Sequence, residues 1–190
     1  MNEGKRELVD LGLPSGTLWA TCNLGAKEPW EKGDYYAWGE IKAKTRYNAS
    51  NSITYGLWPE DLGFKSFGNL PNYDAATHHD SELSTPTFAD FQELAENCEC
   101  ILIELENGKL GMKANGKNGN SIFLPFGGEI NDDYVVYDNQ YGYYWVGTPY
   151  AGSVDKYGDC FWIGEHGMNF YYLKKYEGAS IRPIKRRKEK

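Results

Sequence analysis

Two stretches, YYWVGTPYAG at 143–152 and DCFWIGEHGMNFYYL at 159–173, carry most of the information about the fold. In both, short runs of apolar and polar residues alternate and are separated by glycine-containing turns, which is typical of antiparallel strands joined by tight connections. We predict four short strands here and just beyond. They are Tyr143–Thr148, Asp159–Gly164, Met168–Leu173 and Ala179–Ile184. These four strands predict an antiparallel sheet in the C-terminal part of the chain.

The alternation between 159 and 173 separates two sets of side chains. One set points inward and contains Phe161, Ile163, Met168 and Phe170. The other set points outward and, with residues of the neighbouring turns, makes one exposed surface of Tyr157, Trp162, Glu165, His166, Asn169, Tyr171, Tyr172 and Tyr176. Rigid rings beside polar groups are what binding surfaces use, so this surface is the candidate ligand-binding site. The alternative is a second core layer in which the 33–77 loops cover Trp162.

Composition indicates one domain rich in strands and loops. The chain has 190 residues, of which 15% are aromatic and 22 are Gly, a mixture that favours strands and turns over long helices. We predict a flexible N-terminus at 1–6, a single domain at 7–184 and a basic tail at 185–190. The net charge of −7 repels phosphate backbones, so nucleic acid is not an expected partner.

Localisation stays open from the sequence. No apolar run approaches the roughly 18 residues of a membrane span, and residues 1–6 lack the apolar core of a secretory signal. A cytoplasmic protein, a phage-associated protein and a mature fragment of a cell-surface protein all fit this pattern.

The cysteines match no known metal or redox motif, and Cys98 and Cys100 would hold a metal only with ligands from elsewhere in the chain. Their positions are 22, 98, 100 and 160, a spacing that matches neither a zinc ribbon nor a CxxC motif. We expect buried free thiols and no cofactor.

The first two thirds of the chain predict one helix among strands and loops. Residues 7–23 read as a hairpin around Pro-Ser-Gly, and residues 33–77 as long loops held by buried aromatic rings. A helix at 87–97 is indicated by a capping Thr at 85 or 87 and one apolar face of Phe88, Phe91, Leu94 and Ala95. An Asn-Gly turn at 106–109 predicts a second hairpin, followed by a buried strand in SIFLPF at 121–126.

Six blocks, in order along the chain, resemble one known family. They are VDLGLPSGTLWATCNLGA at 9–26, GDYYAWGE at 33–40, YDAAT at 73–77, NGNSIFLPFGG at 118–128, YYWVGTPY at 143–150 and SIRPI at 180–184. Together they are similar to the Fibrobacter succinogenes major paralogous domain of gut Bacteroidetes. The resemblance implies an α+β, C-type-lectin-like fold, in which a twisted antiparallel sheet and one or two helices support much loop.

The resemblance also implies a role for parts of this chain. It makes Trp145 a core residue and the last third a ligand-binding face, and some members of this fold are variable proteins of diversity-generating retroelements. Two segments depart from the family pattern: residues 80–87 replace its Gly-Gly-Trp-Arg-Met-Pro-Thr, and residues 144–148 replace its Tyr-Trp-Ser-Ser-Thr. We therefore expect a non-catalytic module that binds a protein or a glycan.

Other classes of function remain as alternatives. His78 and His79 lie beside Asp74 and Asp80, which suggests a metal-assisted enzyme related to the formylglycine-generating enzymes. That group uses paired cysteines that have no counterpart here. His166 beside Glu165 would be a second acid–base pair. A further alternative is a structural component of an envelope or phage particle, and the oligomeric state is open.

One calcium site is conceivable from the acidic residues of the last third. Asn131, Asp132 and Asp133 lie near Asp138 and Asn139 in the sequence, and carboxylate and amide oxygens are the ligands that Ca²⁺ prefers. A turn-rich acidic loop explains the same residues. We favour the loop.

Overall fold

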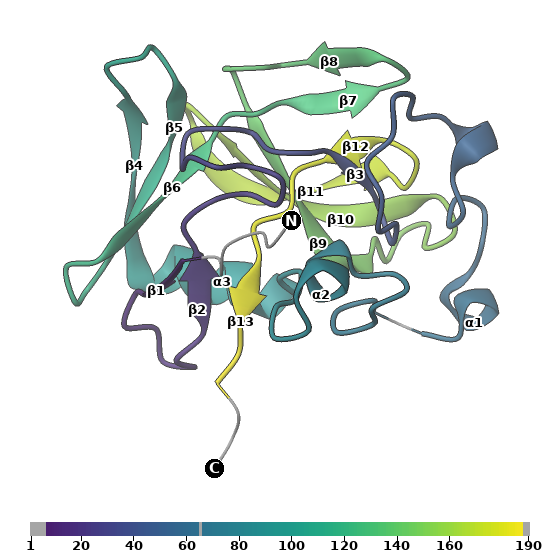
Figure 1. Cartoon of the computed structure of the whole chain (residues 1–190), viewed down its shortest axis with the longest axis horizontal. Coiled ribbons are helices and arrows are strands. Elements are labelled where there is room, and N and C mark those ends of the chain that lie inside the picture. Colours follow the sequence, from purple (N-terminus) through teal and green to yellow (C-terminus); the bar gives the residue numbers. More distant parts are fainter. Residues whose placement is uncertain (1–6, 65, 188–190) are drawn as a thin grey trace.

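The computed structural model describes residues 7–64 and 66–187. Its elements alternate short strands with a few helices (Figure 1). The first half contains β1 (Leu8–Asp10), β2 (Leu18–Ala20), β3 (Tyr36–Ala37), the 3₁₀ turn η1 (Ala49–Asn51), α1 (Pro59–Leu62), α2 (Ala75–His79) and α3 (Phe88–Asn97). The second half contains β4 (Cys98–Glu104), β5 (Leu110–Gly116), β6 (Ser121–Pro125), β7 (Glu129–Asn131), β8 (Tyr134–Val136), β9 (Gly142–Pro149), β10 (Tyr157–Gly164), β11 (Gly167–Lys174), β12 (Gly178–Ala179) and β13 (Ile184–Lys185). The chain is thus of the α+β class, with mostly antiparallel sheets and few helices.

The strands form several small sheets, where the sequence suggested one. Their orders are β1-β2-β13, β11-β10-β9, β3-β12-β7-β8 and β4-β5-β6. Single parallel bridges, Gly128 to Gly142 and Tyr144 to Ser180, connect neighbouring sheets. The terminal segments meet because Ile184 of β13 pairs with Trp19 of β2.

The predicted strand Ala179–Ile184 is wrong as a single element. Its two ends belong to different sheets, as β12 and β13. Between them, Ser180 exchanges backbone hydrogen bonds with β9, and Pro183 has no N–H to continue a ladder. The Arg182 side chain is fully buried here and donates to Asn23 Oδ1 (2.8 Å) and to the carbonyls of Ala20 (2.9 Å) and Phe123 (2.8 Å).

Helix α3 confirms the prediction at 87–97, with one change to its apolar face. Thr87 is the N-cap, and a capping box joins it to Asp90. Phe91 and Leu94 are fully buried, and Phe91 stacks on Phe161 with ring centroids 4.4 Å apart. Phe88 is 44% exposed and was predicted to be buried. It lies in the first turn, where it stacks on Phe170 at the outer end of the helix (3.8 Å).

The predicted hairpins are present. In β1–β2, Leu8 pairs with Ala20, and in β4–β5, Glu104 pairs with Leu110. The second turn is longer than the two-residue turn that Asn-Gly suggested, because Leu105 N–H bonds to Lys109 O (2.9 Å) and Gly108 takes φ of 75°.

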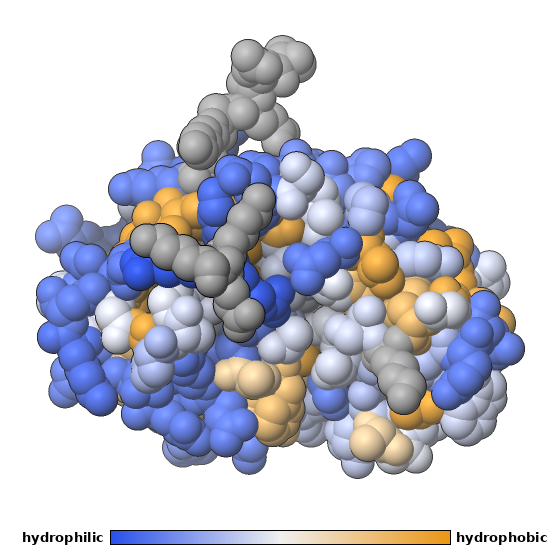
Figure 2. All heavy atoms as spheres, turned by 90° about the horizontal axis from the view of Figure 1, so that it is seen from below, coloured by the Kyte–Doolittle hydropathy of each residue, from blue (hydrophilic) through white to orange (hydrophobic). Residues whose placement is uncertain are grey.

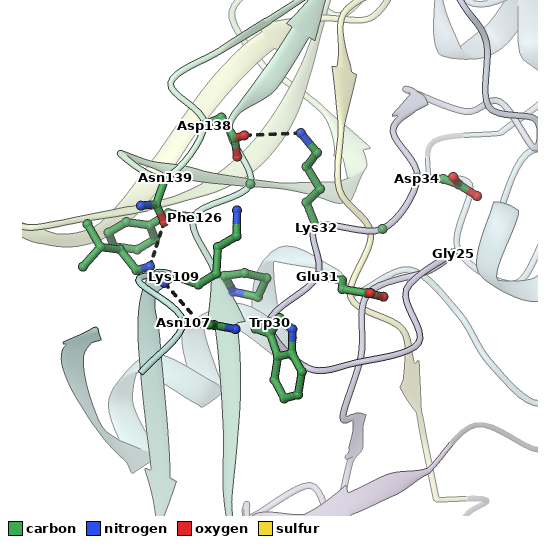
Figure 3. Close-up of a pocket in the computed structure, with 14 residues that line it drawn as sticks. Gly25, Trp30, Glu31, Lys32, Asp34, Asn107, Lys109, Phe126, Asp138 and Asn139 are labelled. Atoms are coloured by element: carbon green, nitrogen blue, oxygen red, sulfur yellow. Dashed lines mark hydrogen bonds and ion pairs between the residues drawn. The ribbon is translucent and has the colours of Figure 1, made fainter. Parts of the chain in front are cut away.

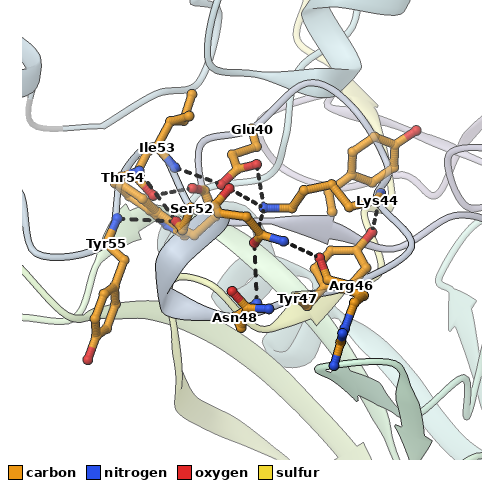
Figure 4. A network of polar contacts seen from close by, with 12 residues as sticks. Glu40, Lys44, Arg46, Tyr47, Asn48, Ser52, Ile53, Thr54 and Tyr55 are labelled. Atoms are coloured by element: carbon orange, nitrogen blue, oxygen red, sulfur yellow. Dashed lines mark hydrogen bonds and ion pairs between the residues drawn. The ribbon is translucent and has the colours of Figure 1, made fainter.

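Buried rings hold the long 33–77 segment, as predicted. Tyr36, Trp38, Tyr47 and Phe67 are each at most 2% exposed. A polar network adds to them (Figure 4): Lys44 pairs with Glu40 (2.7 Å), whose carboxylate also accepts from Ile53 N–H (3.1 Å). The segment is therefore fixed at many points although it has little regular structure.

Three basic residues of the predicted tail belong to the folded body. Lys185 lies in β13 and pairs with Glu82 (2.8 Å), Arg186 pairs with Asp90 (2.5 Å), and Arg187 pairs with Asp10 (2.6 Å). Residues 188–190 and the N-terminal residues 1–6 lie outside the described part. Figure 2 shows this side of the molecule, where hydrophobic residues form small groups separated by hydrophilic side chains.

All four cysteines are free thiols. Cys22 and Cys160 are buried as predicted, whereas Cys98 and Cys100 are half-buried on β4. Burial raises the pKa of Cys100 to about 11, so this thiol stays protonated at neutral pH.

Candidate functional site

The sheet β9–β10–β11 is packed on both faces, and this positions the candidate site. On one face, Tyr144, Val146, Phe161 and Ile163 join the core cluster around α3. On the other face, Tyr143, Trp145, Cys160 and Leu173 join a second cluster. Trp145 is fully buried and donates from Nε1 to Tyr36 O (2.5 Å), which confirms it as a core residue.

The second face opens at one end into a hollow of about 470 Å³ that we call the tyrosine hollow. Strand pairing brings its residues together, since Trp162 lies opposite Tyr143 on one side and Asn169 on the other. The turn after β8 supplies the remaining wall. The lining residues are Tyr137, Tyr141, Tyr143, Trp162, Asn169, Phe170 and Tyr171.

Ring contacts order the walls of the tyrosine hollow. The ring centroid of Tyr141 lies 5.4 Å from that of Trp162 and 5.5 Å from that of Tyr137. The ring centroids of Tyr143 and Tyr171 are 6.5 Å apart. Tyr137 has φ of 60°, a left-handed conformation that is uncommon for a bulky residue. It is 46% exposed, and Tyr171 is 50% exposed, so both rings are open to a ligand.

The chemistry of the tyrosine hollow is neutral. Among the described residues that line it, none carries a charge at neutral pH. Burial raises the pKa of Tyr143, and to a smaller extent that of Tyr171, so both hydroxyls stay protonated and act as donor and acceptor. The hollow offers ring surface, hydroxyls and one amide.

A carboxylate lies behind this wall. Burial, and then the negative charge of Glu177, raise the pKa of Glu129 to about 7. Glu129 Oε2 is buried and has no hydrogen-bond partner among the described residues. Glu177 is better satisfied, because it accepts from Asn131 Nδ2 (3.0 Å) and from Lys174 N–H (2.8 Å).

The structure brings together only part of the predicted surface. Trp162, Asn169 and Tyr171 line the tyrosine hollow, with Trp162 half-buried against Tyr141. Tyr172 stacks on both Tyr171 (5.1 Å) and Tyr150 (4.4 Å).

The other predicted residues lie apart. The ring centroid of Tyr157 lies 5.3 Å from that of Tyr172, so Tyr157 lies outside the tyrosine hollow and adjoins the stacked rings of Tyr150, Tyr171 and Tyr172. Glu165 and His166 occupy the exposed β10–β11 turn, where they pair with each other (3.1 Å). Tyr176 packs on Tyr55 (4.9 Å), outside the tyrosine hollow.

Sequence reasoning missed Tyr137, Tyr141 and Tyr143 as site residues, and it placed Phe170, which also lines the tyrosine hollow, only in the inward set. Strand alternation could have identified Tyr143, because it points away from the core residue Tyr144 and shares a face with Trp162. Tyr137 and Tyr141 carry none, because they lie in an irregular turn whose position depends on long-range contacts.

The histidines and acidic residues considered for metal binding do not converge. His78 and His79 end α2, and the Asp74 carboxylate is occupied by Ala76 N–H (3.0 Å) and by Thr85 Oγ1 (2.7 Å). Within 7–64 and 66–187, no group of His, Cys, Asp or Glu side chains has the arrangement of a metal site.

The conceivable calcium ligands are likewise separated. Asp132 pairs with Arg46 through both oxygens (2.8 Å each), and Asn139 bonds to Leu110 N–H (2.7 Å). Asp138 lies beside Lys32 (3.4 Å).

A second hollow, of about 530 Å³, has a different chemistry. It lies between the 25–34 loop, the β4–β5 turn and the end of β6, and we call it the charged hollow. Lys32 and Lys109 extend toward Asp138, and Trp30 lies at the opposite end (Figure 3). Both positively and negatively charged side chains line it.

Among the described residues, no helix is long and apolar enough to cross a membrane. The six sequence blocks are spread through the fold: 9–26 contains the end of β1 and all of β2, and 143–150 covers most of β9. Comparison with known proteins found no matching family model, curated protein or solved structure.

Proposed function

We propose that this chain is a non-catalytic binding module, and that the tyrosine hollow receives a protein or glycan ligand. The observation that carries the proposal is the uncharged hollow itself, lined by rings from β9, β10, β11 and the turn after β8. Its volume of about 470 Å³ lies within the range of ligand pockets in proteins. Contacts between its rings, and the packed sheet that carries Tyr143, Trp162 and Tyr171, hold the walls in place, which lowers the entropic cost of binding.

We further propose a C-type-lectin-like fold and membership of the Fibrobacter succinogenes paralogous family. Paired terminal strands, a large share of loop and a hollow built from the last third of the chain support this assignment. A variable protein of a diversity-generating retroelement is one form of this function. Such a protein would vary outward residues such as Asn169 and Tyr171, while Phe161 and Ile163 hold the sheet.

A binding screen tests the proposal. The wild-type domain is applied to arrays of glycans and of bacterial surface proteins, and each hit is repeated with Tyr171→Ala. Tyr134→Ala is the matched control, because Tyr134 is 71% exposed and lies outside the tyrosine hollow. We expect loss of capture with the first variant only. Equal capture by both variants would place the binding site elsewhere on the molecule.

A further inference from the structure

Strand β4 is an open edge with apolar side chains on both faces. The strand order β4-β5-β6 leaves one side of β4 without a neighbour, and β4 lies at the outer left of Figure 1. Ile101 is 41% exposed and Leu102, which points to the opposite face, is 43% exposed. A long apolar edge of this kind is normally covered or blunted.

The outer backbone groups of β4 are unpaired in the described structure. The β5 residues that face β6 include Leu110, whose carbonyl accepts from Phe126 N–H (2.9 Å). Because bonding direction alternates along an antiparallel strand, Lys113 faces β4 and bonds to Ile101. The N–H groups of Cys100, Leu102 and Glu104 therefore point outward, and no partner for them exists among the described residues.

Two other long strands, β9 and β11, lie at the edges of their sheet. The outer side of β9 bonds to the backbone of Ser180 and Pro86, and β11 is protected by side chains. Phe170 N–H donates to Asn169 Oδ1, and Lys174 N–H donates to Glu177 Oε2, both at 2.8 Å. These side chains occupy donors that an added strand would need. Among these three described strands, β4 therefore has the edge that is available for pairing.

We propose that the β4 edge pairs with β4 of a second copy of this chain, antiparallel, with Ile101 on the two-fold axis. This register places Cys100 opposite Leu102 of the second copy, so that the outward groups of these two residues pair, while the Cys98 N–H remains bonded to Leu94 O of α3. It also places Ile101 beside Ile101 of the second copy, which covers part of the exposed surface of Ile101 and Leu102. A two-fold pairing leaves no β4 edge free, so the product is a closed dimer.

The charges on β4 suit self-pairing in this register. Glu99 lies opposite Ile103 and Glu104 lies opposite Cys98, so no two carboxylates face each other directly. Like charges placed directly opposite each other would destabilise the pair. A second copy therefore fits the edge although the chain as a whole carries a net charge of −7.

Sedimentation of the full chain over a wide concentration range tests the dimer. We expect a mass of twice 21.6 kDa for the wild type. Ile101→Glu and Ile101→Lys each put two like charges on the axis, so each variant alone should be monomeric, with unchanged circular dichroism. Mixing the two should restore a dimer, because Glu then faces Lys.

Ile53→Glu is the control variant, since Ile53 is 57% exposed on a loop away from β4, and it should remain dimeric. The proposal is overturned if the wild type is monomeric at all concentrations, if either charge variant remains dimeric alone, or if their mixture stays monomeric.

Discussion

Tyr143 of β9 lies directly opposite Trp162 of β10, and the two rings share the wall of the tyrosine hollow. Their sheet neighbours Tyr144 and Phe161 also lie opposite each other but point into the core around α3. One pair of strands thus builds the core with one face and the hollow with the other. Substitutions on the two faces should therefore have separable effects.

Trp162→Ala should weaken binding of the ligand found by screening. Large aromatic anchors contribute about 2 kcal/mol or more to binding, which is roughly a thirtyfold change in Kd. Titration calorimetry of wild type and variant measures this. The melting temperature should fall only modestly, because Trp162 is half-buried. An unchanged Kd would show that the ligand does not use the hollow.

Trp145→Ala should strongly destabilise the domain. This ring is fully buried, and loss of a buried aromatic side chain costs roughly 3–5 kcal/mol. Urea denaturation measures the free energy of unfolding. Trp30→Ala is the control, since Trp30 is 38% exposed and its removal should cost much less. Similar losses in both variants would contradict the assignment of Trp145 to the core.

Arg182→Lys should be strongly destabilising although the charge is kept. The Arg182 guanidinium donates to Asn23, Ala20 and Phe123, and a lysine ammonium cannot reproduce this planar set of donors. Loss of a buried charge's partners costs about 3 kcal/mol or more. The control is Arg46→Lys at an exposed ion pair, where we expect a change below about 1 kcal/mol. Thermal melts of both variants measure these changes in stability, and equal changes would contradict the prediction.

Glu129 should make the protein less stable as pH rises from about 4.5 to about 7. Its pKa in the folded state is about 7, against an ordinary value of 4.5, so the folded state holds more protons in this interval. Glu129→Gln removes the titration. The variant should gain stability over the wild type at pH 8 and gain less at pH 5, in urea denaturation at each pH.

The comparison of wild type and variant at each pH measures the titration of Glu129 together with its coupling to Glu177. Burial also raises the pKa of Asp159, to about 6. The titration of Asp159 lowers the stability of wild type and variant alike as pH rises. A stability difference that is the same at pH 5 and pH 8 would show that Glu129 does not titrate as described.

Local patterns predicted what depends on local chemistry. Thr87 and Asp90 begin α3 through their own hydrogen bonds, and strict alternation places Phe161 and Ile163 in the core. These features need only neighbours in sequence. The prediction that Phe88 is buried is wrong, because the apolar face of a helix does not show how far along the helix the surface that it packs on extends.

Long-range arrangement could not be read from the chain in the same way. Tyr137 and Tyr141 reach the tyrosine hollow only because the turn after β8 folds back over β9 and β10. Residues 179–184 look like one strand, yet the buried Arg182 and Pro183 divide them between two sheets. Alternation identifies the faces of a strand but not which sheet the strand joins.

The pairing of β2 with β13 has a consequence for how the chain folds as it is made. The sheet that contains Trp19 is complete only when Ile184 pairs with it. Strand β2 therefore lacks its β13 partner until nearly the whole described chain has been synthesised. Contacts of such sequence separation slow folding, because a long loop must close before they form. The apolar residues of β1 and β2 are exposed in that interval, and nascent chains of this protein should therefore depend on chaperones more than a domain built from local contacts.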